Sequence, residues 1–123
     1  MRLLFDTHVV LWWDAGTTLS LETIGLIEEA EQVYVSAVTG WEVAIKSALG
    51  KLRTRRTVSQ AMEASGFVEL PVYLRHAELV ATLPWYHRDP FDRLLVAQAL
   101  QEGLTLVTRD PIFERYGVPV ILA

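Results

Sequence analysis

The chain has 123 residues, of which 51% are hydrophobic and 21% charged, with a net charge of −4 and no cysteine. This composition predicts one globular domain over 1–123 and excludes a disordered chain, a disulfide framework and a thiolate metal site. The N-terminus meets an acid at Asp6 and no apolar run is long enough for a membrane span, so we expect a cytoplasmic protein without a signal peptide. The negative net charge means that binding to nucleic acid would need a local basic patch or a metal ion.

The pattern of apolar residues, caps and turns predicts strands and helices in alternation. In the first half we expect a strand at 2–5, a helix at 8–13, a helix from the N-cap Ser20 to about 31, a strand at 33–35 and, after a turn at Ser36, a helix at about 39–49 followed by Gly50. In the second half we expect a helix from the capping box of Thr57 and Gln60 to Gly66, a strand at 67–70, a helix at 73–83, a helix from Asp89 to Gly103, a strand at 104–107, a short helix after Asp110 and an edge strand at 119–122. Five short apolar strands alternating with helices predict a three-layer α/β/α fold around a mostly parallel five-stranded sheet.

The helix after Asp89 carries an acid in an unusual place. Asp89 followed by Pro90 is typical of an N-cap with proline at the first helical position. Asp92 lies one turn further on and shares a face with apolar residues at 95, 96 and 99. A carboxylate on an apolar face needs a partner or a metal ion, so we expect another part of the chain to meet Asp92.

Three other acids fall at corresponding places. Asp6 follows the first strand, Glu42 lies in the first turn of the helix after the second, and Asp110 follows the fourth. In an open parallel sheet these positions collect along the edge where ligands bind. Carboxylates gathered there repel one another unless a hard divalent cation neutralises them. Such a site suits phosphodiester hydrolysis, because Mg²⁺ or Mn²⁺ polarises the phosphate and activates a bound water.

Most of these acids also have a purely structural interpretation. Glu42 fits a capping box with Thr39 and is spaced to pair with Lys46. Asp110 precedes a proline, as Asp89 does, and is a suitable N-cap. Asp6 is the hardest to explain in this way, because an acid at the end of a strand has no generic role. Four coincidental caps on one edge explain the pattern less well than one shared site does.

A basic segment follows the helix that carries Glu42. Its members are Lys46, Lys51, Arg53, Arg55 and Arg56, and no acid lies between 43 and 62. A run of this kind is often only a solvated surface. Its start lies near the predicted site, which also suits contacts with the phosphate backbone of a nucleic acid. The three histidines have no spacing typical of a zinc motif, so we expect His8 and His87 to lie near the site without being ligands.

The ordered set of motifs resembles the PIN-domain ribonucleases, in particular the VapC toxins of bacterial and archaeal toxin–antitoxin pairs. The resemblance runs from end to end and rests on Leu4–His8, Ser36–Lys46, His87–Ala99 and Leu106–Asp110. Gly40 occupies a position where many relatives carry a larger residue, which leaves the acids undisturbed.

The resemblance implies an endoribonuclease that depends on Mg²⁺ or Mn²⁺. It assigns the family's four catalytic and metal-binding acids to Asp6, Glu42, Asp92 and Asp110, with Thr7, Thr108 and Asp89 in supporting roles. It further implies an RNA substrate, a homodimer and silencing by a cognate antitoxin protein whose C-terminal segment occupies the groove.

Two non-enzymatic interpretations stay open. One is a receiver-like module, which also binds Mg²⁺ among acids at the end of a parallel sheet. Such a module needs an acceptor Asp after the third strand and a Lys after the last, and the sequence places neither there. The other is a catalytically silent PIN-like domain that binds RNA or a partner protein, which the intact set of acids disfavours.

Overall fold

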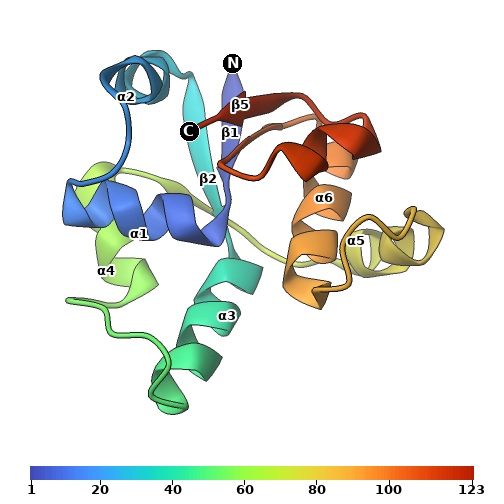
Figure 1. The fold of residues 1–123 in the computed structure, drawn as a ribbon, viewed down its shortest axis with the longest axis horizontal. Coiled ribbons are helices and arrows are strands. Elements are labelled where there is room, and N and C mark those ends of the chain that lie inside the picture. Colours follow the sequence, from blue (N-terminus) through green and yellow to red (C-terminus); the bar gives the residue numbers. More distant parts are fainter.

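The computed structural model describes residues 1–123 and contains one five-stranded sheet flanked by helices (Figure 1). The strands are β1 (Arg2–Phe5), β2 (Gln32–Ser36), β3 (Val68–Leu70), β4 (Thr105–Thr108) and β5 (Val120–Leu122). Their order in the sheet is β3-β2-β1-β4-β5, and every neighbouring pair is parallel. The predicted α/β class is therefore confirmed, with β1 at the centre and β5 at an edge.

Helices cover both faces of this sheet. They are α1 (Thr7–Ala15), α2 (Leu21–Glu29), α3 (Ala37–Ala48), α4 (Val58–Ser65), α5 (Leu74–Leu79) and α6 (Pro90–Glu102), with the 3₁₀ helices η1 (Val80–Thr82) and η2 (Pro111–Tyr116). Alternate residues of β1 enter two separate cores, because successive side chains of a strand point to opposite faces. Leu4 packs with buried residues of α6, whereas Leu3 and Phe5 pack with those of α1 and α2. None of the helices has the length and hydropathy of a membrane span.

Several predicted boundaries are confirmed by their caps. The Ser20 hydroxyl accepts a hydrogen bond from Thr23 N, and Thr57 and Gln60 form the reciprocal capping box of α4. Asp89 accepts hydrogen bonds from the first turn of α6, and Gly103 ends that helix with a φ of 66°. The left-handed conformation favours glycine at this end because a Cβ would be strained there.

Other local predictions were wrong. Helix α3 begins at Ala37 and is capped by Ser36, so Thr39 is a buried residue of the first turn and forms no capping box with Glu42. The predicted helices at 73–83 and after Asp110 are present, although the first is divided into α5 and η1 and the second is the 3₁₀ helix η2. Asp6, expected to have no capping role, is the N-cap of α1. Ser36 and Thr39 both suit a cap, and packing against the sheet decides between them.

The fold brings the starts of three helices to one edge of the sheet. β1 and β2 run toward the region from which α1 and α3 begin, and the first turns of α6 lie beside α3 (Figure 1). Helix α6 is held firmly because Leu95, Val96 and Ala97 are fully buried. The acids after β1 and in the first turns of α3 and α6 therefore come from rigid elements.

Candidate metal centre

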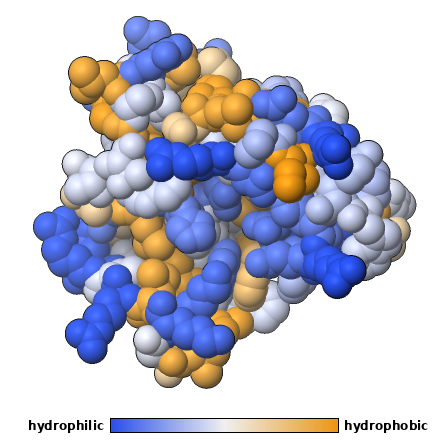
Figure 2. Space-filling view, in the orientation of Figure 1, coloured by the Kyte–Doolittle hydropathy of each residue, from blue (hydrophilic) through white to orange (hydrophobic).

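Asp6, Glu42 and Asp92 gather at this edge and repel one another. The charge of Glu42 helps to raise the pKa of Asp6, and the charges of Asp6 and Glu42 both help to raise that of Asp92. Three segments separated along the sequence thus place negative charges within electrostatic reach of each other. On the face shown in Figure 2, the surface between α1, α3 and α6 is mainly hydrophilic.

Asp6 is tightly held by its neighbours. Its Oδ1 accepts a hydrogen bond of 2.8 Å from Thr7 N, and its Oδ2 accepts one of 2.7 Å from the Thr108 hydroxyl. Burial raises the pKa of Asp6 above its ordinary value, although both hydrogen bonds oppose the shift. The two hydrogen bonds fix the orientation of the carboxylate, but they do not fully offset the effect of burial on its pKa.

Glu42 is buried, with both oxygens engaged. Its Oε1 accepts a hydrogen bond of 2.7 Å from the Thr7 hydroxyl, which also lies 3.3 Å from the Thr39 hydroxyl. Its Oε2 pairs with Lys46 Nζ at 2.5 Å, which confirms the pairing expected one helical turn away. The pKa of Lys46 is raised, mainly by the hydrogen bond to Glu42 and to a smaller extent by the charges of Asp89 and Asp92. Lys46 thus brings a positive charge to this group of acids.

Asp92 differs from the other acids because its side chain accepts no hydrogen bond from the protein. It is half-buried beside the negative charges of Asp89, Asp6 and Glu42. Burial first, and then these charges, raise its pKa to about 7. A carboxylate in this position is stabilised either by a proton or by a cation.

Asp110 lies at the border of this group. Its Oδ1 caps η2 by accepting from Ile112 N, and its Oδ2 lies 2.8 Å from His87 Nε2. Burial would raise the pKa of Asp110, but the hydrogen bonds from His87 and Ile112 outweigh it and hold the pKa below its ordinary value. Asp110 N also donates to the Thr108 hydroxyl, which links this acid to Asp6.

The remaining predicted residues divide into two groups. Thr7, His8, Lys46 and Lys51 line a hollow of about 230 Å³ with Glu42, so the start of the basic segment does lie beside the acids. Arg56 instead pairs with Asp14 at the end of α1, and Arg55 donates to the Asp14 carbonyl. Lys51 and Arg53 form no ion pair and leave their charges free.

The donor set suits a hard cation, although the acids are not arranged as a finished coordination shell. No group of three or more His, Asp or Glu side chains is placed so that it could hold a metal ion. The assignment of Asp6, Glu42, Asp92 and Asp110 as metal ligands therefore stays a prediction. The chemistry nevertheless fits Mg²⁺ or Mn²⁺, because the four acids offer oxygen donors and the Asp92 side chain accepts no hydrogen bond.

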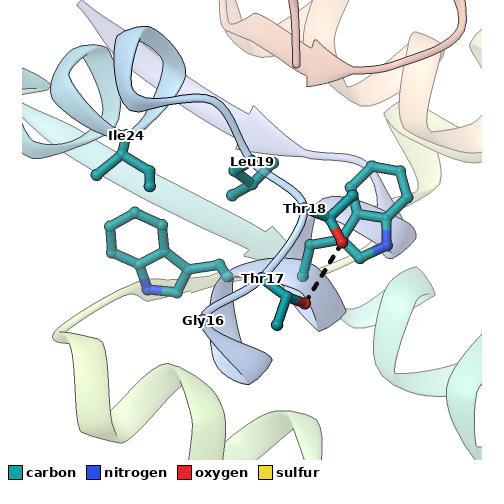
Figure 3. Close-up of a pocket in the computed structure, with 7 residues that line it drawn as sticks. Gly16, Thr17, Thr18, Leu19 and Ile24 are labelled. Carbon is teal, nitrogen blue, oxygen red and sulfur yellow. Dashed lines mark hydrogen bonds between the residues drawn. The ribbon is translucent and has the colours of Figure 1, made fainter.

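A separate, apolar hollow lies at the junction of α1 and α2. It measures about 260 Å³ and is lined by both tryptophans of α1 together with residues of the following loop and α2. Figure 3 shows Leu19 and Ile24 pointing into it, beside the turn at Gly16. No acid of the candidate metal centre lines this hollow, so it is distinct from that centre.

Sequence reasoning missed the surroundings of His87. The ring is almost buried, stacks against Tyr116 with an interplanar angle of 12° and lies 4.4 Å from Phe113 between ring centroids. The loop that carries it is held by Arg93, whose guanidinium donates to the carbonyls of Val80, Leu83 and Pro84. Neither contact has a signal in residue spacing, because each depends on the path of the loop.

Comparisons with known proteins match the chain to one family. A model of the PIN domain matches residues 3–119. The chain is 30% identical to Ribonuclease VapC22 of Mycobacterium tuberculosis over 116 residues, which cover 88% of this chain and 86% of that protein.

Two solved structures show the same fold. VapBC2 from Rickettsia felis, bound to a DNA fragment from its promoter, matches with a TM-score of 0.75 and 14% identity, covering 99% of this chain and 98% of that one. FitAcB from Neisseria gonorrhoeae matches with a TM-score of 0.66 and 23% identity, covering 97% and 96% of the two chains. Since the family model spans nearly the whole chain and the relative reaches this identity, the chain belongs to the PIN-domain family.

Proposed function

We propose that this protein is an endoribonuclease dependent on Mg²⁺ or Mn²⁺ and acts as the toxin of a toxin–antitoxin pair. One observation carries the proposal: Asp92 is half-buried and accepts no hydrogen bond, and its pKa is raised to about 7 by burial first and then by the charges of Asp89, Asp6 and Glu42. Asp92 therefore keeps all its lone pairs free for a cation, and each carboxylate oxygen of Asp6, Glu42 and Asp110 accepts one hydrogen bond and keeps a second lone pair. The membership of the family and the relative named as a ribonuclease support the same conclusion.

In this proposal Asp6, Glu42, Asp92 and Asp110 hold the cation. When bound there, a divalent ion would polarise the scissile phosphate and lower the pKa of a water molecule. The protein supplies the arrangement of the acids. Thr108 and Thr7 orient Asp6 and Glu42, and Asp89 fixes the start of the helix that carries Asp92. Lys46 is placed to attract a phosphate while it balances the charge of Glu42.

The proposed substrate is RNA bound along the basic segment. Lys46 and Lys51 lie at the hollow that contains Glu42, and the free charge of Arg53 extends the basic surface away from it. Arg55 and Arg56 belong to the same predicted surface, although Arg56 is neutralised by Asp14. Contacts of this kind bind the phosphate backbone and carry little sequence information.

The proposed protein partners are a cognate antitoxin and a second copy of this chain. Both expectations came with the resemblance to VapC toxins. The solved structures that share the fold include a toxin–antitoxin complex from Klebsiella pneumoniae, with a TM-score of 0.62, 23% identity and coverage of 97% and 95% of the two chains. Copurification with a neighbouring small antitoxin gene would test the partner independently of the chemistry.

Cleavage of a defined single-stranded RNA by the wild type and by Asp6→Asn tests the activity. The amide can still accept from Thr7 N and can donate to the Thr108 hydroxyl, so the fold should persist while the charge is lost. We expect cleavage that requires Mg²⁺ or Mn²⁺, stops with a chelator and falls at least about 100-fold in the variant. Equal cleavage by a pure Asp6→Asn protein would contradict the assignment. Absence of both cleavage and Mn²⁺ binding in the wild type would favour the catalytically silent alternative.

A further inference from the structure

His87 and Tyr116 form a chain of hydrogen bonds that ends on Asp110. The backbone N–H of His87 donates to the Tyr116 hydroxyl oxygen at 2.8 Å, and His87 Nδ1 lies 2.9 Å from the same oxygen. On the other side of the ring, Nε2 lies 2.8 Å from Asp110 Oδ2. The imidazole therefore bridges a tyrosine and one of the four acids.

The contacts assign the proton on the imidazole. A carboxylate oxygen can only accept, so His87 Nε2 must carry the hydrogen that faces Asp110. The Tyr116 oxygen already accepts from the backbone of His87, which leaves its own hydrogen free to donate to Nδ1. This arrangement selects the Nε2–H tautomer and uses both nitrogens of the ring.

The ring has little freedom to leave this position. Its side chain is 9% exposed and is packed between the rings of Phe113 and Tyr116. The loop before α6 is fixed by Arg93, which is 3% exposed and bonds to loop carbonyls, including that of His87 at 3.4 Å. Trp85 covers the Arg93 guanidinium at 3.9 Å. The buried Arg93 and the rings of Phe113 and Tyr116 thus hold the His87 side chain in one place.

We propose that His87, held by Tyr116, is a positioning residue that fixes the carboxylate of Asp110 for metal binding. This inference rests on the proposed function, because it gives a purpose to one of the proposed ligands. Without His87, only Ile112 N would restrain the Asp110 side chain, and that side chain is 36% exposed. Partners that orient a metal ligand typically change metal affinity or activity by about 10- to 100-fold when removed.

Three variants separate positioning from packing. His87→Phe keeps an aromatic ring between Phe113 and Tyr116 but cannot donate to Asp110. His87→Gln replaces the ring by an amide that can donate from a similar reach. Tyr116→Phe removes the hydroxyl that fixes the tautomer, and Tyr86→Phe is its matched control, because the Tyr86 ring belongs to the same aromatic group at 5.0 Å from Tyr116 and its hydroxyl makes no hydrogen bond.

The experiment measures Mn²⁺ affinity without RNA, the rate of RNA cleavage and the thermal midpoint of each variant. We expect His87→Phe to weaken Mn²⁺ binding and slow cleavage by at least about 10-fold. We expect His87→Gln to recover most of that loss, Tyr116→Phe to lose several-fold and Tyr86→Phe to match the wild type. If His87→Phe is unfolded, the pairs His87→Gln with wild type and Tyr116→Phe with Tyr86→Phe still decide the outcome.

A spectroscopic measurement adds a test that does not depend on activity. The ¹⁵N chemical shifts of the His87 ring report which nitrogen carries a proton, and the proposal requires one on Nε2, facing Asp110. The inference is overturned if the ring is the Nδ1–H tautomer, if His87→Phe binds Mn²⁺ as the wild type does, or if His87→Gln is as deficient as His87→Phe. If Mn²⁺ binding depends on His87 while the wild type cleaves no RNA, positioning stands and the proposed function fails. If the wild type cleaves RNA and His87→Phe cleaves it equally well, the proposed function stands and the positioning role of His87 fails.

Discussion

The hydroxyl of Thr108 donates a hydrogen bond of 2.7 Å to Asp6 Oδ2, although the two residues are 102 positions apart in the chain. The contact is possible because β1 and β4 are parallel neighbours, with Phe5 opposite Val107, so their carboxyl ends lie side by side. The same hydroxyl accepts from Asp110 N. Thr108 thus connects the first and the last of the four acids through one buried oxygen atom.

Replacing Thr108 with valine should therefore disturb both acids. The change keeps the shape of the side chain while it leaves Asp6 without a donor and Asp110 N without an acceptor. We expect a loss of about 1–3 kcal/mol in the free energy of unfolding and a reduction of cleavage by about 10- to 100-fold. Thr105→Val in the same strand is the matched control, since the Thr105 hydroxyl makes no hydrogen bond. Similar cleavage by both variants would show that Thr108 does not support the site.

The raised pKa of Asp92 predicts how stability depends on pH in the absence of metal. Between about pH 4 and 7 the folded protein keeps a proton on Asp92 that the unfolded chain has released. The free energy of unfolding should therefore fall as the pH rises through this window. Asp6, whose pKa is also raised, contributes in the same direction.

Asp92→Asn should remove this dependence. Near pH 4 we expect the variant to be about as stable as the wild type, because both side chains are then neutral. At pH 8 we expect it to be more stable by about 1–2 kcal/mol, after allowing for solvent screening of a half-buried group. Urea unfolding at the two pH values, with a chelator present, measures the difference. If the variant is less stable than the wild type at pH 8, the charge of Asp92 does not destabilise the folded protein.

Divalent cations should reverse the effect of pH. A cation bound to the carboxylates stabilises the folded state, by about 2.7 kcal/mol when its concentration is 100 times the dissociation constant. Protons compete for Asp92, so we expect Mn²⁺ to raise the thermal midpoint more at pH 8 than at pH 5.5. Asp92→Asn should lose most of this increase. An equal increase at both pH values would place the bound ion elsewhere.

The unpaired cations predict how RNA binding responds to salt. Neutralising Lys51 or Arg53 should lower the slope of log affinity against log salt concentration by about 0.7 each, if each contacts one phosphate. Binding by an inactive Asp6→Asn background avoids cleavage during the titration. Arg75→Gln is the control, because Arg75 lies on α5 and is engaged by Glu102. If the slope is unchanged when Lys51 or Arg53 is neutralised, these residues contact no phosphate and the basic segment is only a solvated surface.

Much of the candidate site could be predicted because it follows from strand ends and helix starts. The Asp89–Pro90 cap and Gly103 define α6 locally, and the parallel order of the strands then brings Asp6, Glu42 and Asp92 to one edge. Asp6 also caps α1, so one residue combines a structural role with the proposed chemical one. The sequence pattern indicated its position at this edge but did not reveal the cap.

The parts that could not be predicted depend on contacts between distant loops. His87 meets Asp110 across 23 positions because Arg93 draws the loop before α6 against that helix. His87 and Arg93, which lie near the Asp89 cap, have many possible partners, and the spacing of residues in the sequence does not indicate which of them they contact. The choice of Ser36 over Thr39 as the cap of α3 was likewise decided by where β2 ends in the sheet.

The carboxylates at this edge are proposed to bind a divalent cation. Anomalous diffraction from crystals soaked in Mn²⁺ would locate such an ion, with Asp92→Asn crystals treated in the same way. We predict a Mn²⁺ peak in contact with Asp6 and Asp92 in the wild type, and its loss or strong reduction in the variant. A wild-type crystal with no peak at these acids, or with Mn²⁺ bound only elsewhere, would contradict the account.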